Sequence, residues 1–345
     1  MKTVYFLGAG FSVPFGLPTM NEFLPFADSC SRLDQPADRE FLGGLLLDSR
    51  RANSFLESSP FNIEDILSFA IMADRLGLTG DKPHGPRVIE ILRRVYTSVQ
   101  NKVAYWSDLS KCKHLFNQKL DYSVITTNYD LNIECALLSA RRGRCNPGGL
   151  IFKETPRHQP SDFMYDAHGL PIYKLHGSVN WYLPEERDYD QSEIEVDNGI
   201  IQGVEADGAG HHLEYKVPFV CLQNVHAPRE AIIIPPSFLK PELVPAMRKV
   251  WQGAAKELET ASRAVFIGYS FPPSDTEMMY FLARAFAENQ GLRSIHIVDP
   301  RADEIEKNLT GPESRYGSHF KRFLRIHPHG WEEMCKCKPS LHENV

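Results

Sequence analysis

The sequence has no run of 18 or more apolar residues, so it contains no segment typical of a membrane-spanning helix. Its nearest match to a secretory signal, residues 4–11, is followed by Pro14, Gly16 and Pro18 and by no small-residue cleavage site. Cysteine is scarce, with seven widely scattered residues, so disulfide bonds are not expected to hold the fold. We therefore expect a cytoplasmic protein with reduced thiols.

Basic residues are not in excess either. The chain has 38 Lys and Arg against 44 Asp and Glu, a formal net charge of -6. Because direct binding of a nucleic-acid backbone requires a basic surface, we expect neither direct nucleic-acid binding nor membrane binding. A chain of 345 residues with 42% hydrophobic content can bury a substantial core.

Short apolar runs predict the strands of the core. They cover residues 3–7, 122–126, 172–175, 231–234, 264–267 and 294–298, and helical patterns follow at 243–260 and 276–288. Continuous apolar runs are typical of parallel strands covered on both faces. Strands that alternate with helices favour an α/β fold with a Rossmann-like, doubly wound parallel sheet.

Two stretches interrupt this pattern. Residues 21–116 have helical periodicity and predict an inserted helical lobe. Residues 185–210 are acidic and then glycine-rich, which favours a solvated, mobile insertion over an interaction patch. We expect one domain over residues 1–345, with the remainder of the core in 117–335.

The first candidate site follows the first strand. Gly8-Ala9-Gly10-Phe11-Ser12 is succeeded by Gly16-Leu17-Pro18. Glycines permit a sharp turn and a close approach to a pyrophosphate, whose charge is favoured by amides at a helix N-terminus. Because the third glycine is not at the usual dinucleotide-binding spacing, a strand and turn without a ligand is the alternative.

The second candidate site is the polar segment Thr126-Thr127-Asn128-Tyr129-Asp130, which follows a strand and precedes a helix near residue 131. Ligands of open α/β sheets bind outside the carboxyl ends of the strands. A helix N-cap supplied by Asn128 or Asp130 is the alternative. Since a cap needs only one such residue, the four polar residues favour a functional site.

Three more polar turns follow strands. His176-Gly177 offers a general base with space beside it, although a lone histidine is more often structural. Gly268-Tyr269-Ser270 could line phosphates, and Asp299 is placed to accept hydrogen bonds from ribose hydroxyls. Ordinary turn chemistry is the alternative for both.

Taken in order, these segments resemble landmarks of the sirtuin superfamily. The G-A-G-x-S, G-I-P, T-Q-N-I-D, H-G and G-T-S elements correspond to residues 8–12, 16–18, 126–130, 176–177 and 268–270. The strand 231–234 before Pro235-Pro236, the helix around Trp251, and residues 268–272 leading to Asp275 resemble the bacterial branch that defends against phage. Members of that branch typically hydrolyse NAD.

The chain departs from the sirtuin deacylases at two places. Their zinc module needs two C-x-x-C pairs between the H-G and G-T-S elements, whereas only Cys221 lies there. Thr19-Met20-Asn21 follows Pro18 in place of their acidic, aromatic and arginine triplet. We therefore expect no metal, and the pair Cys335 and Cys337 is interpreted as reduced thiols.

The resemblance implies an NAD+ glycohydrolase that releases nicotinamide and ADP-ribose, with NAD as substrate. Asn128 would orient the ribose or water, His176 would act as general base, and Asp130 would orient Asn128 or hold the nicotinamide. The dinucleotide-binding residues implied are Gly8, Ala9, Gly10, Ser12, Pro18, Thr127, Gly268, Ser270 and Asp299. The alternatives are a catalytically silent NAD- or ADP-ribose-binding subunit and, less favoured, a protein deacylase or ADP-ribosyltransferase.

Unrestrained NAD hydrolysis would harm the host cell, so the resemblance also implies a regulated effector of antiviral defence. We expect sensing to belong to another chain encoded nearby, such as a DNA-translocating ATPase or a short Argonaute. A homo-oligomer is also expected, with the helical lobe as the favoured contact surface.

Overall fold

The structure is a computed structural model. It describes residues 1–23, 36–53, 63–80, 83–102, 121–134, 145–146, 151–154, 169–183, 193–196, 200–202, 205–206, 212–213, 218–220, 231–234, 245–272, 275–312, 314, 318–331 and 333.

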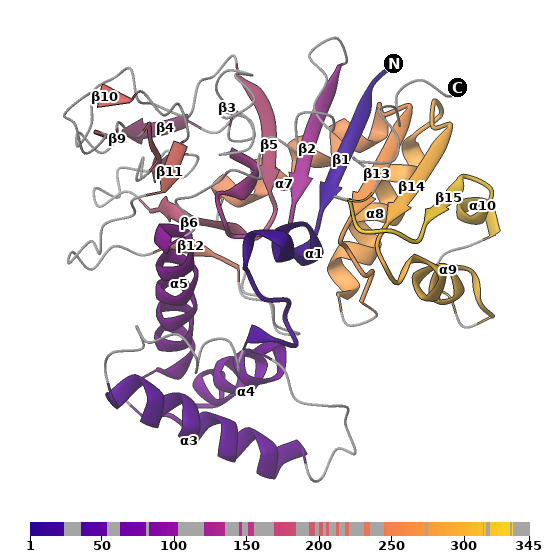
Figure 1. Ribbon diagram of the computed structural model, residues 1–345. Helices are drawn as coiled ribbons and strands as arrows, with labels where there is room; N and C mark the ends of the chain where they lie inside the picture. Colours follow the sequence, from indigo (N-terminus) through magenta and orange to yellow (C-terminus); the bar gives the residue numbers. More distant parts are fainter. Residues whose placement is uncertain are drawn as a thin grey trace.

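The core is a sheet of seven strands in the order β15-β14-β13-β1-β2-β5-β3, and every neighbouring pair is parallel (Figure 1). The strands are β1 (Thr3–Leu7), β2 (Tyr122–Thr126), β3 (Cys145–Asn146), β5 (Leu170–Lys174), β13 (Arg263–Ile267), β14 (Ser294–Val298) and β15 (Leu324–His327). The chain builds outward from β1 through β2 and β5, then returns to β13 on the other side of β1. The junction of β1 and β13 is therefore the point where the strand order reverses, as in a Rossmann-like sheet.

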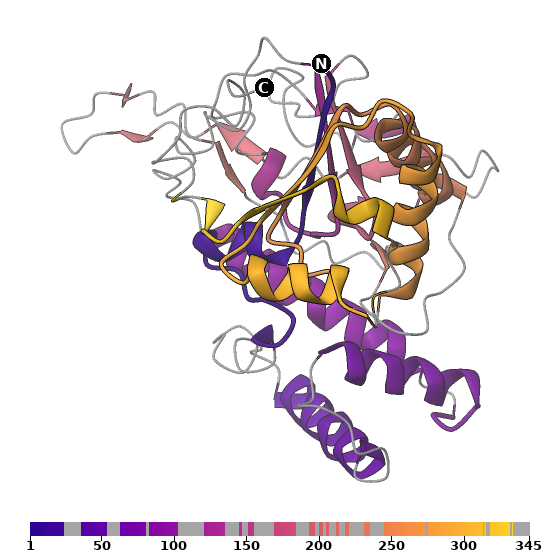
Figure 2. The same cartoon turned by 90° about the vertical axis from the view of Figure 1, so that its right-hand side faces the viewer.

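Helices cover both faces of this sheet. In Figure 2, α7 (Pro245–Glu259) and α8 (Thr276–Glu288) lie along one face, and α1 (Ala9–Ser12) lies on the other. The helix α9 (Ala302–Thr310) packs against β15. All five residues of β1 and all five of β13 are buried, which explains why these strands are continuous apolar runs. The predicted α/β fold class is confirmed.

One predicted strand lies outside the parallel sheet. β12 (Ala231–Ile233) pairs antiparallel with β6 (Gly177–Tyr182) in a second sheet of order β12-β6-β7-β4, so its expected place in the core sheet is wrong. The other two strands of this sheet are β4 (Ile151–Glu154) and β7 (Glu193–Val196). A short buried strand has the same apolar run in either kind of sheet, so periodicity alone could not distinguish them.

The second sheet includes part of the expected acidic insertion. Ile194 and Val196 of β7 are fully buried, and β7 pairs with both β6 and β4, so this part of residues 185–210 is folded rather than solvated. Two small ladders pair β8 (Ile200–Gln202) with β11 (Pro218–Val220) and β9 (Glu205–Ala206) with β10 (His212–Leu213). Residues 185–192, and the other parts of 185–210 between these strands, lie outside the described residues.

Three long helices separate β1 from β2 and form the lobe below the sheet in Figure 1. They are α3 (Pro36–Asn53), α4 (Ile63–Arg75) and α5 (His84–Lys102). Apolar positions on α4 and α5 face each other, as Ile66, Leu67, Ile91 and Leu92 are all buried. The predicted helical pattern is thus present in the described part of residues 21–116, while residues 103–116 lie outside it.

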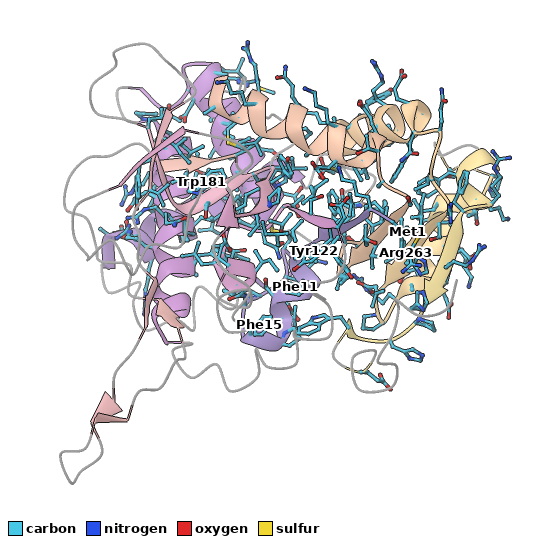
Figure 3. All side chains as sticks on the ribbon, turned by 90° about the horizontal axis from the view of Figure 1, so that it is seen from above. Met1, Phe11, Phe15, Tyr122, Trp181 and Arg263 are labelled. Atoms are coloured by element: carbon cyan, nitrogen blue, oxygen red, sulfur yellow. The ribbon has the colours of Figure 1, made fainter. Side chains whose placement is uncertain are left out.

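The C-terminal part of the chain closes the core beside α1. Figure 3 shows Phe11 and Phe15 next to each other, and their ring centroids are 5.7 Å apart. Trp331 stacks on Phe11 at 5.1 Å and its indole nitrogen donates a hydrogen bond to the Phe11 carbonyl at 3.2 Å. Neither this contact nor β15 was predicted from the sequence. No helix in the described ranges is long and apolar enough to cross a membrane.

Two stacked histidines join β14 and β15 and make stability depend on pH. The rings of His296 and His327 are 5.2 Å apart and nearly parallel, with 2.9 Å between Nδ1 and Nε2. Burial, aided by His327, Arg263 and Arg325, lowers the pKa of His296 to about 4. Because this folded-state pKa is below the ordinary value of 6.5, the stabilisation is complete above pH 6.5 and is lost as pH falls toward 4. We expect urea titrations between pH 7 and 4.5 to show a loss of about 1–2 kcal/mol from this group, after solvent screening.

The variant His296→Gln should have a smaller decrease in unfolding free energy over this pH range, because the group that gains a proton is gone. His329 is exposed, so His329→Gln is the matched control and should keep the wild-type pH dependence. Equal slopes for wild type and His296→Gln would contradict the prediction.

Candidate active site

A cleft of about 590 Å³ opens at the carboxyl ends of the central strands, a size typical of small-molecule sites. Residues that follow β1, β2, β5, β13 and β14 all contribute to its wall. Its lining is Ala9, Gly10, Leu17, Pro18, Thr19, Met20, Asn21, Glu22, Tyr96, Thr127, Asn128, Tyr129, Asp130, His176, Gly268, Tyr269, Ser270, Pro272, Asp275, Asp299 and Arg301. The cleft therefore lies where the strand order reverses, the usual ligand position in open α/β sheets.

The glycines at the base of the cleft let two turns pack backbone to backbone. Gly268 has φ of 62°, and a Cβ there would lie 2.4 Å from the carbonyl carbon of Gly10. A Cβ on Gly8 would lie 2.5 Å from the Gly268 oxygen. The Gly10 amide donates a 2.9 Å hydrogen bond to that same oxygen. Glycine is required at residues 8 and 268 because the two turns contact each other closely. Gly8 therefore lies under the cleft and does not line it.

A hydrogen-bonded chain of three side chains lies beside the cleft. Asn128 Nδ2 donates to the Gly8 carbonyl at 2.8 Å and to Ser12 Oγ at 3.1 Å. Ser12 Oγ in turn donates to Asp130 Oδ2 at 2.7 Å. The amide of Asn128 is therefore fixed in orientation, and no hydrogen-bond donor to its Oδ1 is found among the described residues. This oxygen is available to a ligand in the cleft.

Asp130 also has the capping role that the sequence left open. Its Oδ1 accepts a 2.9 Å hydrogen bond from the Asn132 amide at the start of a helical turn, so this carboxylate both caps the turn and holds Ser12. Its side chain is almost fully buried, and burial raises the pKa of Asp130 although Lys174 opposes that shift. The turn thus contains a buried acid in direct hydrogen-bond contact with the side chain that orients Asn128.

His176 enters the cleft from the turn between β5 and β6. Its ring lies 6.2 Å from that of Tyr129, and its carbonyl accepts a hydrogen bond from the Ile234 amide at 2.9 Å. Gly177 has φ of 80°, and a Cβ there would lie 1.9 Å from the Ile232 oxygen. Glycine at residue 177 is therefore required for β12 to pack against this turn, and this packing fixes the backbone of His176 at the cleft.

Asp299 lies at the far end of the cleft, after β14. Its Oδ1 accepts a 2.8 Å hydrogen bond from the Arg301 amide, and only 7% of the residue is exposed. The Arg301 guanidinium is 4.0 Å from the same oxygen and its side chain is 64% exposed. This local hydrogen bond is the turn interaction that the sequence left open as an alternative. Asp299 also contributes to the cleft wall.

Several cleft residues were not identified in the sequence. The clearest is Tyr96 of α5, which the helical lobe brings to the cleft from a distant part of the chain. Its ring lies 5.7 Å from that of Tyr129 and 5.7 Å from that of Phe23, and burial raises its pKa. Nothing in the sequence around a single tyrosine in a helix indicates that its side chain reaches the cleft. Arg301 was missed although its position two residues after Asp299 was a signal.

The structure brings ten of the twelve sequence-predicted site residues to one cleft. They are Ala9, Gly10, Pro18, Thr127, Asn128, Asp130, His176, Gly268, Ser270 and Asp299. Gly8 and Ser12 do not line it, because Gly8 packs under Gly268 and Ser12 links Asn128 to Asp130. Their predicted contact with a dinucleotide has no support from the geometry of the cleft wall.

The part of the chain that the structure describes holds no group of three His, Cys, Asp or Glu residues arranged for a metal ion. Cys221, Cys335 and Cys337 lie outside the described residues, as do Pro235 and Pro236.

Comparisons with known proteins complete this description. No model of a protein family matches the chain, and no curated protein matches it. Among solved structures, it is similar to a Sir2 homologue in complex with NAD, with 13% identity, 97% of this chain and 86% of that chain covered, and a TM-score of 0.41. It is also similar to a Sir2 complex with a p53 peptide and NAD+, with 14% identity, coverages of 97% and 90%, and a TM-score of 0.35. A mutant Sir2 homologue bound to 2′-O-acetyl ADP ribose has 12% identity, coverages of 99% and 95%, and a TM-score of 0.39.

Proposed function

We propose that this protein binds NAD in the cleft and hydrolyses the bond between nicotinamide and ribose. The observation that carries the proposal is the convergence of Asn128 and His176 on one cleft, with Asp130 fixing Asn128 through Ser12. These residues come from separate strand ends, and a turn or a cap alone requires no such meeting. The cleft volume also lies in the range of cofactor sites.

The reaction breaks the bond between the anomeric carbon and the nicotinamide nitrogen, whose electron pair leaves with nicotinamide. A water oxygen then bonds to that carbon, and the proton of the water passes to His176 as general base. Positive charge develops on the ribose as the bond breaks, and fixed dipoles and carboxylates stabilise it. The two hydrogen bonds that Asn128 Nδ2 donates fix the amide, so that Oδ1 orients the water or a ribose hydroxyl. Asp130 acts by holding that amide and by its buried negative charge.

The direct test is to incubate the purified full chain with NAD, with and without the protein encoded beside it, and follow nicotinamide release. Release without any peptide supports hydrolysis, whereas release that requires an acylated peptide would favour a deacylase or transferase. NAD binding without release under either condition would replace the proposal by the catalytically silent binding subunit.

Replacing His176 with alanine should lower nicotinamide release about a hundredfold, because proton transfer from water loses its base. The affinity for NAD, measured by titration calorimetry, should change much less. His84 lies in the helical lobe, outside the cleft lining, and His84→Ala is the matched control. Full activity of His176→Ala would remove this residue from the mechanism.

The proposal includes regulation, since free hydrolysis of NAD would deplete the cell that makes the enzyme. We propose that a separate sensing chain, or assembly of several copies through the helical lobe, activates the cleft during antiviral defence. Tyr96 supports the second route, because it belongs to the lobe and lines the cleft. A measurement of mass in solution with NAD and with the neighbouring protein would identify the active assembly.

A further inference from the structure

A buried ion pair lies directly below the cleft and has no part in the mechanism described above. Lys174 is the last residue of β5, and Glu134 lies in the helical turn after Asp130. Their charged atoms are 2.9 Å apart, and the two side chains are only 1% and 0% exposed. Both charged groups are therefore buried away from water, and Lys174 contacts Asp130 of the cleft wall.

Burial of two charges needs an explanation, because the loss of hydration often exceeds the attraction between them. In other proteins, two apolar residues of similar volume often replace such a pair without loss of stability. Lys174, however, also donates a hydrogen bond to the backbone carbonyl of Asp130 and lies 3.5 Å from that of Tyr129. Its ammonium group therefore ties β5 to the turn that follows β2.

This turn is the segment that carries Asn128 and Asp130. The Leu175 amide, directly after β5, donates to the Thr126 carbonyl at 2.8 Å. Leu175 and the Lys174 side chain therefore contact both ends of the turn. Ser178 adds a third contact from the same side, with its hydroxyl 3.3 Å from the Tyr129 carbonyl. On the opposite side, Asn128 contacts the Gly8 carbonyl and Ser12, and Asp130 contacts Ser12.

We propose that Lys174, held in place by Glu134, is a positioning residue that fixes the turn bearing Asn128 and maintains negative charge on Asp130. The catalytic part of this inference rests on the proposed NAD hydrolysis. The electrostatic part does not, because it concerns the ionisation of a residue in the protein alone.

The charges around Asp130 agree with this assignment. Burial raises the pKa of the carboxyl group, and Lys174 is the strongest influence that lowers it, ahead of hydrogen bonds from Ser12 and Asn132. Glu134 raises the pKa by a smaller amount. Within the described part of the chain, the other titratable groups that line the cleft with Asp130 are Glu22, Tyr96, Tyr129, His176, Tyr269, Asp275, Asp299 and Arg301. Removal of both members of the pair should therefore still favour protonation of Asp130.

The test compares Lys174→Met with the double variant Lys174→Met/Glu134→Leu. The single variant leaves Glu134 buried without its cation and should lose much of its stability, whereas the double variant should regain it. In the double variant we expect kcat for nicotinamide release to fall about tenfold or more, with KM for NAD changed less than about threefold. The acid limb of its kcat profile should move to higher pH.

A second measurement follows Asp130 directly, by carbon NMR of protein labelled at aspartate carboxyl groups, with Asp130→Asn to assign the signal. The midpoint of its titration should also move to higher pH in the double variant. Lys2 forms a 3.0 Å ion pair with Glu257 at the opposite end of the sheet, so Lys2→Met is the matched control and should change neither titration nor kcat.

A folded double variant with wild-type kcat and a wild-type Asp130 titration would show that the pair is only structural and would overturn the inference. If the wild-type protein releases no nicotinamide under any condition, the proposed function fails. The NMR titration would still decide whether Lys174 controls the charge of Asp130, so the two failures are distinguishable.

Discussion

Replacing Asn128 with alanine is expected to lower nicotinamide release by about a hundred- to a thousandfold while the protein remains folded. The Asn128 amide makes 2.8 Å and 3.1 Å contacts to Gly8 and Ser12, which hold its oxygen at the cleft. Alanine keeps the backbone of the turn but removes the only group that these contacts position. Loss of one preorganised polar group that acts in the transition state has an effect of this size. Nicotinamide release at saturating NAD is the measurement.

The control for Asn128→Ala is Asn289→Ala. Asn289 is also half-buried, and its amide donates to the Leu258 and Ala261 carbonyls at 2.6 Å and 2.8 Å, at the opposite end of the sheet. Its loss should reduce stability by about 1 kcal/mol and leave kcat unchanged. If Asn128→Ala retained wild-type release, the hydrogen-bonded chain through Ser12 and Asp130 would have only a structural purpose.

The parts of the fold that depend on local pattern could be predicted. Residues 3–7, 122–126 and 294–298 are strands with the predicted bounds, because both faces of each are covered and the apolar run starts and stops with the strand. The polar residues after them were also predicted to share one edge. That prediction uses only the rule that carboxyl ends of parallel strands meet on one side of a sheet.

The parts that depend on distant contacts could not be predicted. Tyr96 reaches the cleft because α5 extends from the lobe to the second sheet, and its sequence neighbours give no sign of that path. Lys174 was included in a strand, but only the folded chain shows that Glu134 lies 2.9 Å away. β12 was assigned to the wrong sheet because pairing partners are not encoded in a single apolar run.

The glycines illustrate a third case, in which the residue was identified and its physical reason was different. Gly8 was selected for close approach to a pyrophosphate, yet its missing Cβ makes room for Gly268 and Tyr269. The Gly8 and Gly10 amides donate to Ile267 and Gly268, both at 2.9 Å. These two amides are therefore used within the fold, and a dinucleotide would have to contact other groups on the wall.

Gly268→Ala is accordingly expected to reduce stability strongly, because it adds both crowding and backbone strain. The new Cβ would meet Gly10 at 2.4 Å, and alanine would be held at φ of 62°. Backbone strain of about 1 kcal/mol and overpacking of about 1–3 kcal/mol together predict a loss of roughly 3 kcal/mol, measured by urea unfolding. NAD affinity should fall as well, because the turns bearing Gly10 and Ser270 must separate.

The matched control for Gly268→Ala is Gly80→Ala, which separates backbone strain from crowding. Gly80 has φ of 61°, and a Cβ added there would have no atom within 4 Å. This variant therefore isolates the strain and should lose only about 1 kcal/mol. Equal losses in the two variants would show that the contact between the turns after β1 and β13 is loose, and that glycine is needed at residue 268 for its conformation alone.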